Sequence, residues 1–372
     1  MKKYFVTVIC LLSISVIQAQ VTRKYSNDFM SIGVGARGLA MSNAQVAGVS
    51  DITAGYYNPA GLVHINNNIQ LGAMHAELFA GISKYDFVSF AVPFADKTKT
   101  VGFTFLRYGV DNIPNTLNLY NADGSIDYNN IRSFSVGSYG LYIHYAQKIT
   151  AVKKGELSVG VSPKIVYNKM STFANSVGFG IDVGIQYRIK NWRIGFMGRD
   201  LTSTFNAWKF KFTDEEKAVL TKTGNEIPLN TLEITLPRLW FGLAYEYKLK
   251  KIMKITPELN FDLTTDGKRN VILPGKPISL DMNFGLELSF VDIVYLRTGF
   301  GNVQKSTDDR GKKITTFQPN IGAGLGYKGY VRLDYAYTNI GESTGGLYSH
   351  VISLQLGINK KIKKTNPENT IK

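Results

Sequence analysis

Cysteine is almost absent from this chain: Cys10 is the only one among 372 residues. It lies inside an apolar stretch close to the N-terminus, so a processed chain would contain neither a disulfide framework nor a thiol nucleophile. Long apolar runs are missing as well. Beyond residue 20 no segment has the roughly 18 uninterrupted apolar residues of a spanning helix, which excludes a helical membrane protein.

Histidine is also scarce. The four histidines are scattered without the spacing of metal ligands; they are His64, His75, His144 and His350. Residues 121–127 resemble the start of a calcium loop, but Arg132 stands where the bidentate glutamate is needed, and an Asp-Gly hairpin turn is favoured. Residues 33–38 match G-x-G-x-x-G, but only the short stretch 29–32 precedes them and no alternating helices and strands follow, so a dinucleotide site is disfavoured. We therefore expect no enzyme, no metal site and no cofactor.

Residues 1–20 have the features of a secretory signal. Lys2 and Lys3 precede an apolar run over 5–17, and Ala19 is a small residue before the cleavage point. A membrane anchor is the alternative, although the run is shorter than the roughly 20 residues that a spanning helix needs. Removing this segment removes two lysines and no acids, so the net charge falls from +15 to +13. Export argues against nucleic acid as the partner of a basic chain.

From residue 68 onwards, apolar and polar residues alternate with period two. In 177–189 every second residue is apolar, whereas the residues between them are small or polar. Such runs have 9 to 13 residues, close to the 9–11 or so that a tilted strand needs to cross a bilayer. We predict about fourteen strands, at 68–76, 84–94, 99–109, 134–148, 156–168, 176–189, 192–200, 238–249, 252–263, 279–289, 292–300, 315–327, 329–338 and 348–359. The prediction is an all-β, antiparallel transmembrane β-barrel; a soluble sandwich is the alternative.

The connections sort by length. Those after odd-numbered strands are mostly long and those after even-numbered strands mostly short, which is typical of outer-membrane barrels with short periplasmic turns. This pattern predicts an integral outer-membrane protein, in contact with lipid, with a periplasmic N-terminus. Inward-facing carboxylates, namely Asp182, Glu246, Asp281, Glu287 and Asp334, share their face with Arg188, Lys248 and Arg332. We expect these groups to form ion pairs rather than a catalytic site.

Residues 33–65 follow neither period. The segment is rich in Gly and Ala and has few charges, so its backbone polar groups need surroundings that satisfy them. We predict a plug inside the barrel. The predicted organisation is a signal peptide (1–20), a lead and hatch or plug (21–66), the barrel (67–360) and a polar basic tail (361–372).

This segment resembles the N-terminal signature of the PorV/PorQ family, itself similar to FadL fatty-acid channels. The resemblance rests on residues 35–41 (GARGLAM) and 54–62 (AGYYNPAGL). It places a hatch motif at Gly35, Arg37, Gly38, Asn58, Pro59, Ala60 and Gly61. The end of the predicted signal looks like those of exported Bacteroidetes proteins. One departure is the polar tail, where the family's final strand would end on an aromatic residue.

The resemblance implies a non-enzymatic outer-membrane component of the type IX protein secretion system. Its partners would be the translocon, the attachment-complex proteins or secreted substrates. The alternative is a FadL-like channel for long-chain fatty acids or other hydrophobic small molecules, and a third possibility is a structural barrel. Residues 201–237 form a predicted outer loop whose aromatic residues either contact a partner or fold down over the barrel mouth; they are Phe205, Trp208, Phe210 and Phe212.

Overall fold

The computed structural model describes residues 27–121, 123–149, 154–250, 252–307, 311–338 and 348–359. The predicted signal peptide (1–20) and the predicted polar tail (361–372) lie outside these residues. The helices are η1 (Asp28–Ser31), α2 (Ala36–Ala40), α3 (Ala54–Tyr57), η2 (Pro59–His64), η3 (Tyr128–Asn130) and α4 (Asp214–Lys222). Among the described residues, none of these helices has the length and apolar character needed to span a membrane.

Strands make up most of the described chain. They are β1 (Ile69–Leu78), β2 (Ser83–Pro93), β3 (Lys99–Asn115), β4 (Arg132–Ile149), β5 (Glu156–Met170), β6 (Ala174–Ile189), β7 (Trp192–Arg199), β8 (Thr204–Phe210), β9 (Thr231–Thr235), β10 (Arg238–Tyr245), β11 (Tyr247–Leu249), β12 (Met253–Thr264), β13 (Ser279–Phe290), β14 (Val294–Thr307), β15 (Lys313–Tyr327), β16 (Val331–Thr338) and β17 (Ser349–Ile358).

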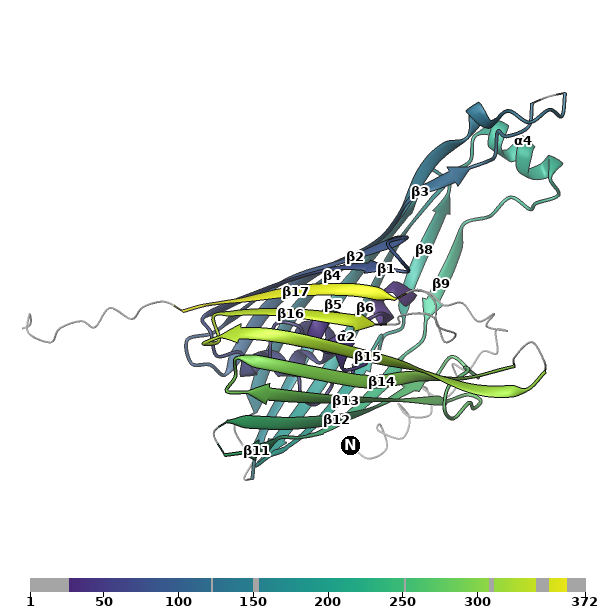
Figure 1. The fold of residues 1–372 in the computed structure, drawn as a ribbon. Helices are drawn as coiled ribbons and strands as arrows, with labels where there is room; N and C mark the ends of the chain where they lie inside the picture. Colours follow the sequence, from purple (N-terminus) through teal and green to yellow (C-terminus); the bar gives the residue numbers. More distant parts are fainter. Residues whose placement is uncertain are drawn as a thin grey trace, which may run out of the picture.

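These strands form one closed antiparallel barrel (Figure 1). The first strand, β1, pairs with β2 on one side and with β17 on the other, which closes the sheet. Both β7 and β8 pair with β6, so they are two parts of one barrel strand. Likewise β9, β10 and β11 follow one another along a single strand. The seventeen segments therefore make fourteen barrel strands, which confirms the predicted fold class.

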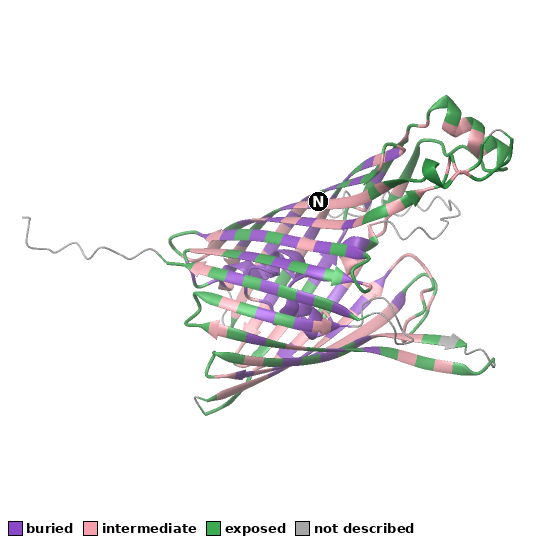
Figure 2. Cartoon of the chain, turned by 45° about the horizontal axis from the view of Figure 1, so that its top comes forward, coloured by how far each residue is buried: buried purple, intermediate pink, exposed green. Residues whose placement is uncertain are grey.

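The alternation in the sequence becomes an outward and an inward face, visible as alternating colours along the strands in Figure 2. On β6, Val177 is 56% exposed whereas its neighbour Ser176 is fully buried. On β4, Ile143 is 60% exposed and His144 only 1%. Apolar side chains thus point away from the barrel, where they suit lipid, and polar or small side chains point into the lumen.

The two ends of the barrel differ in their connections. At one end the strands are joined by long segments, including 116–131, 211–230 and 265–278, and we call it the loop end. At the other, the turn end, the connections include 190–191, 291–293 and 328–330. This confirms the predicted sorting by length. The chain starts β1 at the turn end, but Asn27 lies at the loop end, where its side chain donates to Thr235 (3.0 Å). The periplasmic N-terminus stays a prediction.

Residues 201–237 are not the continuous loop that the sequence predicted. Because β8 pairs with β6 and β9 pairs with β8, the barrel wall itself continues past the loop end. Figure 1 shows this extension rising with β3 and carrying α4 at its tip. The helix α4 begins with a capping box: Thr213 Oγ1 accepts from the Glu216 N–H, and the Glu216 carboxylate accepts from the Thr213 N–H.

The outward face of β4 allows a test of the membrane assignment. Replacing Ile143 with arginine should lower the free energy of unfolding by about 2–4 kcal/mol, because a charge then faces the middle of the hydrocarbon. The matched control is Ile131→Arg, which lies just before β4 at the loop end and should change stability by about 0–1 kcal/mol. Urea titrations of protein folded into lipid vesicles measure both, and equal effects would show that Ile143 does not face lipid.

Candidate functional site: a filled lumen with a cavity at each end

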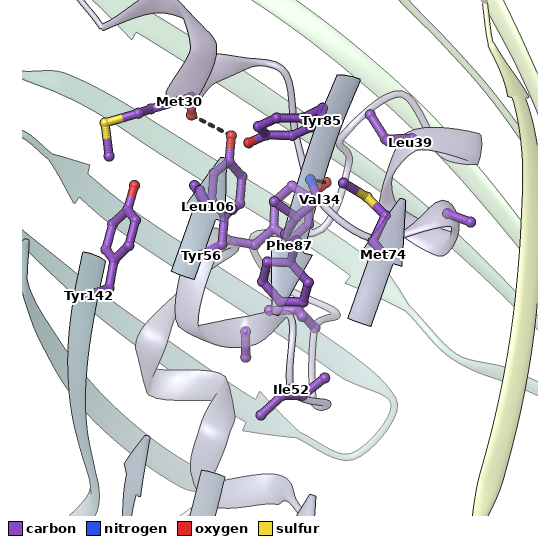
Figure 3. Packing of buried hydrophobic residues seen from close by; sticks show 14 of the residues in the cluster. Met30, Val34, Leu39, Ile52, Tyr56, Met74, Tyr85, Phe87, Leu106 and Tyr142 are labelled. Atoms are coloured by element: carbon purple, nitrogen blue, oxygen red, sulfur yellow. Dashed lines mark hydrogen bonds between the residues drawn. The ribbon is translucent and has the colours of Figure 1, made fainter. Parts of the chain in front are cut away.

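The N-terminal segment occupies the inside of the barrel. From Met30 to Ile65 nearly every apolar side chain is buried, and Val34, Leu39 and Leu62 are at most 3% exposed. They pack against inward-facing residues of the wall (Figure 3), among them Met74, Tyr85, Phe87, Leu106 and Tyr142. This segment, which we call the plug, therefore forms one hydrophobic core together with the inward-facing apolar residues of β1–β4. Its movement as a hatch stays a prediction.

Two neighbouring tyrosines hold the glycine-rich start of the plug. The Tyr56 hydroxyl accepts from the Gly33 N–H (3.1 Å) and donates to the Met30 carbonyl (2.5 Å; Figure 3). The Tyr57 hydroxyl accepts from the Val34 N–H (3.0 Å). At Gly38 a Cβ atom would lie 2.3 Å from the Tyr57 hydroxyl, so this motif position has no room for a side chain. The loop and α3 thus fold as one unit.

The Asn-Pro-Ala part of the motif attaches the plug to β5, β6 and β7. The Asn58 Nδ2 group donates to the carbonyls of Val46 (2.9 Å) and Ile185 (3.0 Å). Its Oδ1 accepts from the Ala60 N–H (3.2 Å), which caps η2. A Cβ atom added to Gly160 would lie 2.4 Å from the Pro59 carbonyl carbon, so wall and plug are in direct backbone contact there.

The buried Asn58 amide leads to a prediction. Replacing Asn58 with leucine, which has nearly the same shape, should reduce stability by about 1–3 kcal/mol, because buried carbonyls lose their donor. The comparison variant is Asn225→Leu, an exposed carboxamide in the connection after α4. Thermal unfolding in detergent measures both. An Asn58→Leu protein as stable as the Asn225→Leu protein would show that these hydrogen bonds do not hold the plug.

A chain of alternating charges joins the plug to the opposite wall. It consists of Arg37, Glu287, Arg297, Asp334, Arg332 and Asp51, which we call the arginine–carboxylate cluster. Arg37 Nε lies 2.8 Å from Glu287, and Arg297 Nε lies 2.6 Å from the same carboxylate. Arg297 and Arg332 both contact Asp334, at 2.8 and 2.9 Å. Arg332 then contacts Asp51 in the plug at 3.2 Å. Three cations and three anions balance inside the barrel.

The other inward-facing carboxylates are mostly paired, as expected. Asp182 contacts Lys164 (2.7 Å), and Glu246 contacts Arg193 and Lys248. Of the carboxylates named from the sequence, Asp281 is the exception and forms no ion pair within the described residues. Of the basic partners named from the sequence, Lys248 and Arg332 pair with carboxylates. Arg188 instead donates to the carbonyl of Val49 (3.4 Å).

Alternation alone could have identified the basic partners Lys164, Arg193 and Arg297, because each lies on the inward side of its strand. The pairing of Arg37 with Glu287 joins residues that are 250 positions apart and carries no local signal. The inward-facing histidine of β4, His144, is hydrogen-bonded to Ser162 (2.7 Å) and Thr104 (2.8 Å), so it is a satisfied core residue.

Two cavities reach into the lumen from its two ends. The loop-end cavity, of about 250 Å³, is lined by Leu39, Ser42 and Asn43 of the plug and by β10 and β12–β15. The turn-end cavity, of about 460 Å³, is lined by charged groups that include Arg37 and Arg332. Leu39 and Arg37 lie two positions apart on α2. The helix α2 therefore lies between the two cavities and lines both of them.

Above the loop-end cavity, the connection between β12 and β13 carries an ion pair between Asp266 and Arg269. Burial raises the pKa of Asp266, but the hydrogen bonds and charge of Arg269 outweigh it, so that the pKa lies below its ordinary value. Within the part of the chain that the structure describes, no group of three or more His, Cys, Asp or Glu side chains could hold a metal ion.

The four candidate contact aromatics lie on the extension and do not share one face. Phe205 is 42% exposed on the outward side of β8. Trp208, Phe210 and Phe212 stack in a row, with ring centroids 6.1 and 6.4 Å apart. The Trp208 indole also donates to Glu233 on β9 (2.9 Å). This stack stabilises the extension, and the extension points away from the barrel mouth rather than folding over it (Figure 1).

A closed barrel of fourteen antiparallel strands with an apolar outer face defines a transmembrane β-barrel. Its fold is FadL-like, as comparison with solved structures shows. The toluene transporter TodX of P. putida gives a TM-score of 0.54 at 13% identity, over 88% of this chain and 99% of that one. The toluene transporter TbuX of Ralstonia pickettii gives 0.53 at 11% identity, with the same coverage. A FadL homologue from Pseudomonas aeruginosa gives 0.50 at 10% identity, over 87% and 97%.

At these identities the similarity shows the fold alone. No family model matches the chain, and no curated protein matches its sequence. The PorV/PorQ resemblance therefore rests on the plug residues quoted above and has no support from these comparisons.

Proposed function

We propose that the protein is an outer-membrane channel for small hydrophobic or amphiphilic molecules, with the plug acting as its hatch. The observation that carries this proposal is the pair of cavities that enter the lumen from the two ends, with α2 lying between them. A modest displacement of residues 36–45 would join them. The toluene transporters with the same fold lend support to small hydrophobic molecules as the substrate class.

Uptake measurements test this function. Cells with and without the gene are given labelled toluene or a labelled long-chain fatty acid, and initial rates of entry are compared. We expect entry to fall when the gene is deleted and to return when it is restored. Equal rates for every compound, with the protein present in the outer membrane, would contradict the channel function.

The proposed orientation places the loop end outside the cell and the turn end in the periplasm. Because Cys10 is the only natural cysteine, single cysteines can report on this. Ser125→Cys lies in an exposed turn at the loop end, and Ala95→Cys in an exposed turn at the turn end. On intact cells a membrane-impermeant maleimide should label the first and not the second. The reverse pattern would invert the orientation.

A second candidate function is the type IX secretion role implied by the plug signature. The extension favours it, because β8, β9 and α4 stand beyond the barrel and expose apolar side chains such as Leu229 (77%) and Leu232 (60%). A chain that only conducts small molecules has no evident need for such a surface. Affinity purification from outer membranes followed by mass spectrometry tests this role. Recovery of no secretion component, from a sample that retains its lipid, would count against it.

A further inference from the structure

The loop-end cavity differs in chemistry from a hydrocarbon site. Its lining includes six carboxamide side chains, contributed by the plug and by four different strands: Asn43, Asn260, Asn283, Asn302, Gln318 and Asn320. A carboxamide both donates and accepts hydrogen bonds and carries no net charge. Ile32 and Leu39 line the same cavity and add a smaller apolar part. The lining as a whole is therefore amphiphilic.

Two buried polar atoms at this cavity have no partner among the described residues. They are the indole Nε1 of Trp240, a donor, and Oδ1 of Asn260, an acceptor. Trp240 is 8% exposed and Asn260 is 4% exposed. Both residues line the cavity through their other atoms, because these two atoms have almost no accessible surface of their own.

The charges around the cavity disfavour an anion. Arg238 is engaged by Asp262 and by the Ser31 hydroxyl (2.7 Å). Asp281 accepts a hydrogen bond from the Met282 N–H (2.8 Å) and has no cationic partner within the described chain. One carboxylate thus remains uncompensated next to the cavity. In a site partly shielded from water, it repels a second carboxylate.

The neighbouring cavity of about 390 Å³ shares Arg238, Asp262, Asp281 and Asn302 with the loop-end cavity. It continues toward the connection between β12 and β13, where Arg269 is paired with Asp266. A molecule that enters from the loop end therefore meets the polar, amide-lined region before it reaches α2.

We propose that the loop-end cavity binds the polar end of an uncharged amphiphile, a carboxamide or hydroxyl, and discriminates against carboxylates. This inference deepens the proposed channel function, because it names the class of molecule, and rests on it for its biological role. The carboxamides of the lining, Asn260 among them, bind the polar end, whereas Ile32 and Leu39 contact the alkyl part. Asp281 provides the discrimination.

Hexanamide and hexanoate are suitable probes because they have nearly the same shape and differ in charge and in donors. The full chain is placed in lipid nanodiscs with Trp192→Phe and Trp208→Phe, so that Trp240 is the single remaining tryptophan. We expect hexanamide to change Trp240 fluorescence saturably, with hexanoate binding at least tenfold more weakly. Equal or tighter binding of hexanoate, or no saturable change with hexanamide, would overturn the proposal.

Variants distinguish an effect on ligand binding from an effect on folding. Asn260→Leu should weaken hexanamide binding at least tenfold, whereas the matched control Asn225→Leu should leave it unchanged. Asp281→Asn should raise the affinity for hexanoate at least tenfold, a gain that a structural defect would not produce. Thermal unfolding of each variant confirms folding. Unchanged affinities in both Asn260→Leu and Asp281→Asn would exclude this cavity as the site.

Uptake by whole cells distinguishes the two proposals. If hexanamide binds as described but neither hexanamide nor toluene enters faster with the gene present, the binding site stands and the channel function fails. If entry depends on the gene but binding does not depend on Asn260 or Asp281, the channel function stands and the inference fails.

Discussion

Replacing Arg37 with methionine is expected to lower the free energy of unfolding by about 3–5 kcal/mol, because it leaves part of a buried charge network without its partner. Arg37 contacts Glu287 through two nitrogens, at 2.8 and 3.2 Å, and Gln45 at 2.6 Å. All of these groups lie inside the barrel. Arg37→Lys keeps the charge but cannot make the paired contact, so an intermediate loss is expected.

The control is Lys217→Met, which removes an exposed pair with Asp214 on α4 and should cost less than about 1 kcal/mol. Urea unfolding gives the stabilities, and single-channel recording in planar bilayers gives a second readout. Since Arg37 and Asp51 are the two plug ends of the arginine–carboxylate cluster, Arg37→Met should also increase conductance through the lumen. A variant with unchanged stability and unchanged conductance would show that the cluster does not retain the plug.

Adding a single methyl group to Gly160 is expected to disturb the plug more than its size suggests. The new Cβ would lie 2.4 Å from the Pro59 carbonyl carbon and 2.5 Å from the Ala60 nitrogen, both backbone atoms that cannot rotate away. We expect Gly160→Ala to cost about 1–3 kcal/mol. Gly195→Ala should act similarly, because its Cβ would lie 2.2 Å from the Val46 carbonyl oxygen.

Gly109→Ala serves as the matched control. Its Cβ would lie 3.3 Å from the end of the flexible Arg107 side chain and 3.6 Å from the Val136 carbonyl oxygen, an ordinary contact distance, so its effect on stability should be small. Thermal unfolding measures the stability of each variant, and limited proteolysis measures how readily its plug leaves the barrel wall and is cut. If Gly160→Ala and Gly109→Ala proteins are equally stable and equally resistant, the wall and plug are not in the tight contact described here.

The strands were predictable because the signal that defines them is local. In 177–189 the polarity of each residue indicates whether it faces outward or into the lumen, since consecutive side chains in a strand point to opposite sides. The same holds for Thr213 and Glu216, whose three-residue spacing is enough to predict the start of α4. Residues 201–237 were predicted to be a loop because β8 and β9 have only 7 and 5 residues, fewer than the 9–11 or so that a membrane-crossing strand needs.

The contacts between the residues of the candidate site have no comparable local signal in the sequence. Arg37 was singled out through its motif, but its partner Glu287 was expected to pair with other lumen residues. The carboxamides of the loop-end cavity, and Trp240 with them, were not recognised at all. Their inward position on β10 and β12–β15 was readable from the alternation, whereas their grouping around one cavity was not.

From the sequence alone, the period-two pattern, the sorted connections and the Gly- and Ala-rich segment determined a fourteen-stranded barrel filled by its own N-terminal region. Only the tertiary structure decided which side chains meet inside it. The reason is physical: barrel closure and the stagger between strands set the height of each inward residue, and these depend on pairing across the whole sheet. The partners of Arg37, the contact between Pro59 and Gly160, and the amide-lined cavity all arise from that pairing.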